Sequence, residues 1–487
     1  MKYASTIQIG MIRSARITAI AAAITLAGCA FAPPAKPPTP PAPDSYAVEP
    51  TPTASTNAEG VAQRFNHGAR AVPEWWRLYE SDTLNTWVAE GLQNNPSLDA
   101  TKHRLEAAHQ LLRAQIGNTE LPSVDVGGQT SRQRALAVPS FGPPTSLYNV
   151  YAGQLQLGYT FDLFGATRHG VAQTAAQVDQ QAYELDAARR ALAANIVVAA
   201  INASALAEQV STSERLSTLA HEQSELTERA YRLGAASHDD LLVAQQNAAA
   251  FDASLPPLRT QALHARHVLA VLMGRTPDQA PLNLAWSQWH LPAEVPVSVP
   301  SELLQQRPDV LAAEAAVHAA SAQVGVATAN LFPHISLSAS LGTGAFHSAS
   351  LFTGAGEIWS IGASLTQPIF HGGALMAQRK AAIADYDASL AQYKQTVLNA
   401  FQNVADSLIA LNQDALALES AQAAAAAAQQ SFTDAGARYR LGAVAYPTTV
   451  VSEQRWQNAR LSEIQAQAAR LADTAALFQA MGTPRGP

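Results

Sequence analysis

The chain contains very little of several features that identify common classes of protein. Cys29 is the only cysteine in 487 residues, so no disulfide can form within the chain. Charged residues make up 14% of the sequence, below the roughly 25% of a typical soluble domain. The net charge is −7 and no block of Lys and Arg stands out, which argues against nucleic acid as a partner.

Signatures of catalysis and of metal binding are also missing. The stretch "HEQSE" (221–225) begins like a zinc-protease motif but lacks the second histidine. His264 and His267 lie at i and i+3 on a predicted helix, and because no third ligand is nearby we interpret them as part of a solvated face. "GTGAFH" follows a strand without opening a helix, so it is no phosphate loop, and no serine-nucleophile elbow is present. We therefore expect no enzymatic activity, cofactor or metal.

Residues 1–28 have the pattern of an export signal. Three basic residues precede a short apolar run that ends at "LAGC". About a dozen apolar residues are too few to cross a bilayer, which needs about 20. The pattern is therefore typical of a cleaved signal peptide, and its basic residues are Lys2, Arg13 and Arg16.

"LAGC" resembles the bacterial lipobox, which implies cleavage before Cys29 and attachment of lipid to that cysteine. The residue after this cysteine is Ala30. An aspartate there would resemble an inner-membrane retention signal, so its absence at this position favours the outer membrane. An ordinary secretory signal with an incidental cysteine is the alternative. Translation from Met11 rather than Met1 would also give a complete signal.

After the signal the sequence divides into a linker and two similar halves. Residues 29–72 are rich in proline, which favours extended chain and indicates a lipid-anchored tether. Landmarks then recur in one order and at nearly constant spacing: "LPSVDV" and "FPHISL", "FDLFG" and "QPIFHG", two copies of "RLGA", and "LMGRTP" and "AMGTPR". We infer a tandem duplication, with repeats at 73–285 and 286–487.

Each repeat is predicted to contain a helix, two strands and a hairpin of two long helices. Apolar residues recur every seven positions over about 166–232, which is coiled-coil spacing. A helix of this length extends on the order of 100 Å at about 1.5 Å per residue, too long for a compact domain. The positions are Val171, Val178, Leu185, Leu192, Ala199 and Leu206, and in the second repeat Met376, Ile383, Leu390, Val397, Val404, Leu411 and Leu418.

The predicted strands alternate between apolar and small polar residues. In "HISLSASLGTG", Ile335, Leu337, Ala339 and Leu341 oppose the serines, and "YNVYAGQLQLGYTFDLF" and "IWSIGASLTQ" alternate in the same way. Such strands suit either a small sheet packed on one face or a membrane barrel with a polar lumen. Because single-chain barrels begin at about eight strands, four strands that cross a membrane require several chains.

Taken in order, these features resemble the TolC family of outer-membrane efflux proteins, and within it the lipoprotein branch of tripartite multidrug efflux systems. The resemblance covers essentially all of the mature chain. It implies a mainly α fold with a β-barrel part: a homotrimer with one twelve-stranded barrel, four strands per chain, and a long periplasmic helical barrel. The stretches that carry it are "WWRLYESDTLNTWVAEGLQNNPSLDA", "RPDVLAAEAAV", "LFPHISLSAS", "TQPIFHGG" and "YRLGAVAY".

The resemblance also implies a passive duct without catalytic groups. A periplasmic adaptor and an inner-membrane pump of the RND class would be its partners, and drugs or other small toxic compounds its cargo. The alternatives are a duct for a one-step protein secretion system and a periplasmic coiled-coil lipoprotein without a pore.

Glycine can supply the left-handed conformation that ends a helix, so both "RLGA" stretches are predicted to be turns at the hairpin tips. The resemblance implies that these tips contact the adaptor, through Arg232, Leu233, Gly234, Ala235, Arg440, Leu441, Gly442 and Ala443. Asp434 and Arg438, one helical turn apart, are candidates for a periplasmic gate; the alternative is an ordinary surface ion pair. Thr433 and Gly436 stand where the family's paired acids align.

Overall fold

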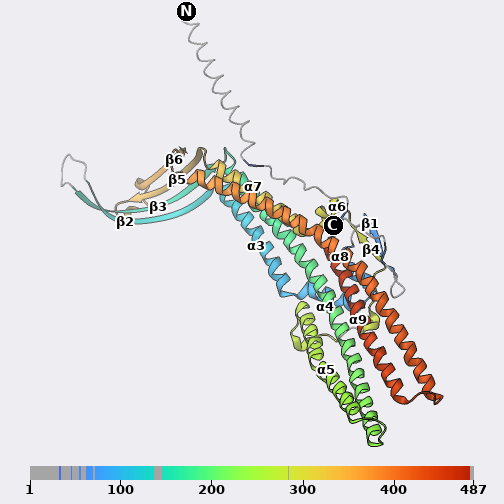
Figure 1. The fold of residues 1–487 in the computed structure, drawn as a ribbon. Helices are drawn as coiled ribbons and strands as arrows, with labels where there is room; N and C mark the ends of the chain where they lie inside the picture. The colour runs from blue at the N-terminus through green and yellow to red at the C-terminus, as the bar shows by residue number, and fades with distance from the viewer. Residues whose placement is uncertain are drawn as a thin grey trace, which may run out of the picture. The chain divides into compact units, whose positions relative to one another are not determined.

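The computed structural model describes residues 32–33, 45–46, 54–55, 62–69, 72–136, 145–282 and 285–482. The predicted signal peptide, Cys29 and most of the predicted linker lie outside these residues. The elements drawn in Figure 1 are, in chain order, β1 (Arg64–His67), η2 (Trp75–Tyr79), α2 (Asp82–Asn94), α3 (Pro96–Thr119), β2 (Ser123–Leu136), β3 (Thr145–Phe161), α4 (Ala166–Arg232), α5 (His238–Leu272), η3 (Pro277–Gln279), η4 (Trp286–Gln288), β4 (Glu294–Val297), α6 (Pro300–Gln306), α7 (Pro308–Ala329), β5 (His334–Ala345), η5 (Ser348–Ser350), η6 (Gly354–Gly356), β6 (Glu357–Thr366), α8 (Ala374–Arg440) and α9 (Tyr446–Met481).

The order of elements repeats, as the sequence predicts. The series α3, β2, β3, α4 and α5 returns as α7, β5, β6, α8 and α9, and α4 and α8 both contain 67 residues. Glycines with positive φ recur at one constant spacing, which places the same left-handed backbone at the same points of each repeat. The pairs are Gly165 and Gly373, Gly234 and Gly442, and Gly274 and Gly482.

The end of each repeat packs against its own beginning through the third glycine pair. Gly274 (φ 80) follows α5, and a Cβ atom there would lie 2.5 Å from the backbone oxygen of Asn94, at the end of α2. Gly482 (φ 67) follows α9, and its Cβ atom would lie 2.9 Å from the backbone oxygen of Gln306, at the end of α6. Only glycine fits both the backbone conformation and this close approach.

The residues immediately before α3 and α7 also connect the beginning of each repeat to its end by hydrogen bonds. The Asn95 side chain donates to the Leu272 carbonyl (2.9 Å), and the Arg307 guanidinium donates to the Ala480 carbonyl (3.0 Å). Leu272 and Ala480 have the same spacing in the chain as the glycine pairs. Matching positions of the two repeats thus perform the same role with different side chains.

The folded chain divides into two compact units, and each takes segments from both repeats. One unit contains Arg104–Ala182 and Ala312–Tyr393, and the other contains Tyr183–Leu311 with the described residues of 40–103 and 394–487. These compact units thus do not coincide with the repeats predicted from the sequence, which meet at residues 285 and 286. The predicted boundary separates two repeats rather than two compact units, and it stays a prediction.

The first unit contains a four-stranded antiparallel sheet with strand order β2-β3-β5-β6. The second contains a two-stranded parallel sheet of β1 and β4, which sequence analysis did not predict. In this unit Trp75 stacks on Phe478 with ring centroids 5.2 Å apart, and Tyr79 meets Trp289 edge to face at 5.9 Å. All four rings are buried, so an aromatic core joins the start of the first repeat to the end of the second.

Apolar residues at the predicted seven-residue spacing form the buried seams of the long helices. Leu192, Val404 and Leu411 are among those buried, while Met376, predicted to begin the second series, is about half exposed. α4 and α7 are long and apolar enough to cross a membrane, but more than half of each apolar window is buried inside the chain. Burial of this kind is also found in the core helices of soluble proteins.

A buried arginine ties the N-terminal segment of the second unit to α9. Arg470 is fully buried, and its guanidinium donates to the Gln63 side-chain oxygen (3.2 Å) and to the Ser55 hydroxyl (3.0 Å). Burial and the neighbouring Asp473 raise the pKa of Asp414 to about 7, against the opposing charge of Arg470. Ionising both carboxylates beside a single guanidinium is unfavourable in a buried site, because the two negative charges repel each other.

Replacing Gly274 with alanine should destabilise the chain by about 1–3 kcal/mol, because alanine resists positive φ and its Cβ would meet the Asn94 oxygen. Gly117→Ala is the matched control, since Gly117 lies in the exposed α3 with no atom near its Cβ position. There alanine should be neutral or stabilising. The thermal unfolding midpoint measures both effects, and equal midpoints for the two variants would contradict the account of this joint.

The raised pKa of Asp414 predicts that stability falls as the pH rises. The folded state binds this proton more tightly than the unfolded state, whose carboxyl titrates near 3.8, so the stabilisation is present at low pH and is lost between about pH 4 and pH 7. Asp414→Asn should flatten the dependence of the unfolding midpoint on pH between about pH 4 and pH 7. Asp387→Asn, an exposed change on the same helix, should keep the slope; an unchanged slope in Asp414→Asn contradicts the prediction.

Candidate pore wall and hairpin tips

One face of the four-stranded sheet is covered by small polar side chains. The strand register places Gln156, Ser340 and Ser360 in one row and Thr160, Ser336 and Ser364 in another. Serine hydroxyls bridge β5 and β6 in both rows, at 2.8 Å for Ser336 and Ser364 and 2.9 Å for Ser340 and Ser360. This face can line a water-filled passage, because its side chains are short and form hydrogen bonds.

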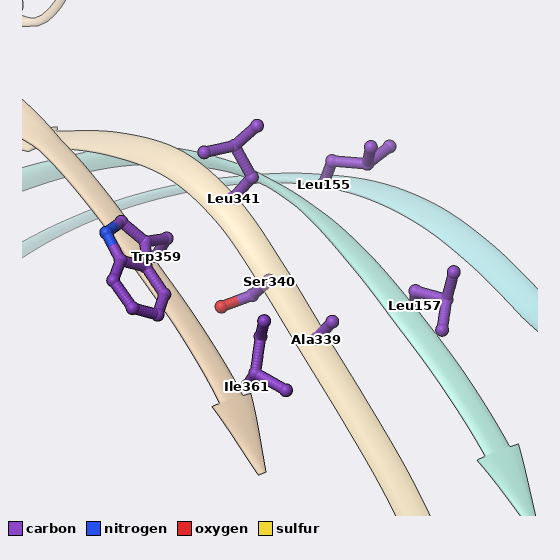
Figure 2. A pocket seen from close by; sticks show the side chains of 7 residues that line it. All are labelled: Leu155, Leu157, Ala339, Ser340, Leu341, Trp359 and Ile361. Atoms are coloured by element: carbon purple, nitrogen blue, oxygen red, sulfur yellow. The ribbon is translucent and has the colours of Figure 1, made fainter.

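The opposite face is apolar and uncovered. Trp359 and Ile361 of β6 are 70% and 73% exposed. Large apolar side chains in contiguous rows are unusual on the surface of a soluble monomer and mark a contact with protein or lipid. Figure 2 shows the side chains that line a pocket on this part of the sheet. Six of them belong to the apolar face, Leu155, Leu157, Ala339, Leu341, Trp359 and Ile361, and the seventh is Ser340 of the polar face.

The sheet has two open edges, since β2 and β6 each pair with only one neighbour among the described residues. Register places Val124 opposite Leu157 and Val126 opposite Leu155, so β2 extends the apolar face to one edge. An unpaired edge leaves a row of backbone donors and acceptors available to another strand. The sheet is therefore a fragment of a larger one whenever it lies in lipid.

Both predicted "RLGA" turns end long helices with the same backbone geometry. At the first, Gly234 has φ 74 and the Ala235 amide donates to the Ala230 carbonyl (2.8 Å). At the second, Gly442 has φ 73 and the Ala443 amide donates to the Arg438 carbonyl (2.9 Å). This arrangement is a Schellman motif, so the predicted turning role of the two glycines is confirmed.

The tip side chains project away from the hairpins. Leu233 and Leu441 are each 84% exposed, and Arg232 and Arg440 are exposed beside them. The helices that leave the two turns begin differently. Ser237 forms a capping box with Asp240 at the start of α5, whereas Ala445, the residue before α9, provides no side-chain cap. The tips thus share a backbone but differ in the residues that follow.

The two gate candidates lie exposed near the end of α8. The Gln430 side chain donates to the Asp434 carboxylate (2.9 Å), and no ion pair joins Asp434 to Arg438 in the described structure. The surface ion pair offered by their spacing is therefore not formed. Both side chains remain available for contacts outside the chain.

A polar ladder between α4 and α9, which sequence analysis missed, joins the two hairpins. Glu208 meets Arg460 and Arg215 meets Glu453, both at 2.6 Å, and the Tyr446 hydroxyl donates to Glu222 at 2.5 Å. The members follow heptad spacing along each helix and run in opposite directions. A search for polar residues at this spacing on both helices could have found the ladder.

The histidines considered in the sequence have no metal-binding surroundings. His264 and His267 are exposed on α5, and among the described residues no three His, Cys, Asp or Glu side chains gather as metal ligands do. His221, from "HEQSE", instead lies 2.8 Å from the Asp252 carboxylate, which also accepts a hydrogen bond from Ser217 (2.6 Å). These contacts connect α4 to α5.

Comparison with known proteins gives one consistent result. Residues 87–275 and 299–483 match the model of the family described as outer membrane efflux protein. The chain is 30% identical over 478 residues to a probable efflux pump outer membrane protein, TtgC, of Pseudomonas putida, covering 94% of this chain and 93% of the relative. It is 30% identical over 404 residues to nodulation protein T of Rhizobium leguminosarum bv. viciae, covering 82% of this chain and 79% of the relative.

The fold agrees with that assignment. The open state of the Neisseria gonorrhoeae MtrE outer membrane channel superposes with a TM-score of 0.73 at 26% identity, over 92% of this chain and 98% of the channel. The predicted TolC-like architecture and the function of an outer-membrane efflux channel are therefore confirmed. One matched segment falls within each predicted repeat, and together with the sheet and hairpins the matches establish that the chain belongs to the outer membrane efflux protein family.

Proposed function

We propose that three copies of the chain form a passive duct of a tripartite pump for drugs or other small toxic compounds. The observation that carries this proposal is the four-stranded sheet, with one polar face, one apolar face and two open edges. Three such sheets give a closed barrel of twelve strands with the serine rows inside, which satisfies every edge. Lipid on Cys29 would anchor each copy to the outer membrane.

The duct needs no catalytic group, because an inner-membrane pump supplies the free energy. We assign the pump to the RND class, joined through a periplasmic adaptor. The exposed Leu233 and Leu441 with their neighbouring arginines support an adaptor contact, since an apolar residue flanked by charge suits a protein interface. The contact set is Arg232, Leu233, Gly234, Ala235, Arg440, Leu441, Gly442 and Ala443.

Capture at the tips in living cells tests the partners. A photoreactive amino acid at Leu233 or at Leu441 should each yield a covalent product with the same adaptor, because both tips carry the same exposed leucine. Phe352, 89% exposed in the loop between β5 and β6, is the control position and should not capture it. Capture of an adaptor that serves an ATP-driven protein exporter would instead favour the secretion duct.

We further propose that Asp434 and Arg438 narrow the closed duct near the tips. Three Asp434 carboxylates in a ring would attract cations, as acidic rings do in channels. The absence of an ion pair between these two described residues supports the proposal, since each charge is left for the passage or for a neighbouring copy.

Single-channel recordings in planar bilayers test the gate. Asp434→Ala and Arg438→Ala should raise closed-state conductance, and Asp434→Ala should also lower cation selectivity. Asp406→Ala is a matched control. Asp406 is also exposed on α8 and accepts a hydrogen bond from Gln402, one turn before it. It lies a whole number of heptads from Asp434, so both aspartates occupy the same heptad position. Unchanged leakage in both tip variants would reject the gate, and no conductance from the unmodified protein would reject the duct.

A further inference from the structure

We propose that β6 of one copy pairs with β2 of a second copy in a single register, with Ala363 opposite Thr130 of the partner subunit. The inference rests on the trimeric barrel of the proposed function and adds which residues meet at the seam. It follows from the repeated order of the strands. We call the β3–β5 pairing inside the chain the inner seam and the β6–β2 pairing between copies the outer seam; both join equivalent strands. The inner seam can therefore serve as the template for the outer one.

Two sequence shifts relate the strands of the repeats. β2 maps onto β5 by the shift that carries Pro122, which precedes the first strand, onto Pro333, which precedes the other. β3 maps onto β6 by the shift that carries Gly165 onto Gly373, both with positive φ at the start of a 67-residue helix.

The observed hairpins verify these shifts. In the first hairpin Val124 pairs with Leu157, and the shifts convert this pair into Ile335 and Leu365. Ile335 and Leu365 are partners in the second hairpin. Val126 with Leu155 converts likewise into Leu337 with Ala363, which is also an observed pair.

Applying the same shifts to the inner seam gives the outer one. Leu155 pairs with Leu341 between β3 and β5, and this becomes Ala363 opposite the partner's Thr130. Gln156 with Ser340 becomes Ser364 opposite the partner's Gln129. A shift by one residue would turn one strand's apolar side chains to the other face, whereas this register keeps each face continuous around the barrel.

The end of the seam provides an independent observation. Phe161 pairs with Ile335 at the end of the inner seam, which becomes Ile369 opposite the partner's Val124. In the single chain Ile369 is 88% exposed and Val124 is 60% exposed. The proposed register thus brings together two apolar side chains that have no cover in one copy.

Cysteine pairs test the register in cell envelopes. Ala363→Cys with Thr130→Cys, and Ser364→Cys with Gln129→Cys, place thiols at adjacent pairs, which alternate between Cα separations of about 5.5 and about 4.5 Å. A disulfide spans both distances, so oxidation should give covalent dimers and trimers on non-reducing gels. Displaced pairs, Ala363→Cys with Gly128→Cys or with Arg132→Cys, have side chains about 7–8 Å apart and should react about tenfold less.

The background of crosslinking is measured with the single-cysteine variants and with the unmodified chain, whose only cysteine is Cys29. The single-cysteine variants also show that each substitution still permits assembly. Native mass spectrometry of the unmodified protein is measured in parallel. A trimer whose displaced pairs react best, or in which no pair reacts, overturns the register while leaving the duct intact. A monomer overturns the proposed function as well.

Discussion

Backbone hydrogen bonding in lipid is the constraint on which the rest of this molecule depends. A strand edge facing hydrocarbon leaves amide and carbonyl groups unpaired, at a cost of several kcal/mol for each group. The chain carries one sheet of four strands whose two edges are open among the described residues, so this sheet cannot satisfy the constraint alone. When further strands close the sheet into a barrel, the serine rows can face the lumen and the apolar rows can face lipid.

The repeated order of elements gives the two halves of the chain matching backbone geometry. Glycines with positive φ occupy matching places at the start of α4 and α8, at both tips and at both closing joints. A left-handed glycine can end a helix. The three shared glycines accompany hairpin helices of nearly equal length in the two repeats: α4 and α8 both have 67 residues, and α5 and α9 have 35 and 36. Side chains at the joints have been free to diverge: Asn95 and Arg307 both hold the end of a repeat by donating to a carbonyl.

Much of this architecture was predictable because its signals are local and periodic. The seven-residue series predicted the bounds of α4, and the alternation of Leu337 and Ser338 assigned the faces of β5, because both patterns follow directly from helix and strand geometry. The β1–β4 sheet could not be predicted, since two short strands from distant parts of the chain carry no period. The Asp434–Arg438 pair was offered from spacing alone, and Gln430 occupies the carboxylate instead.

The polar ladder shows where the two repeats ceased to be equivalent. Within the chain, Glu208–Arg460, Arg215–Glu453 and Glu222–Tyr446 join α4 to α9. The shift that carries Gly234 onto Gly442 exchanges the repeats, and it converts these pairs into Leu416 with Asp252, Ala423 with Gln245, and Gln430 with His238. None of the converted pairs joins opposite fixed charges. Partly exposed ion pairs add little stability, but members at heptad spacing on antiparallel helices match in one register only. The ladder therefore sets how the two hairpins of one chain align, and the equivalent positions carry no comparable device.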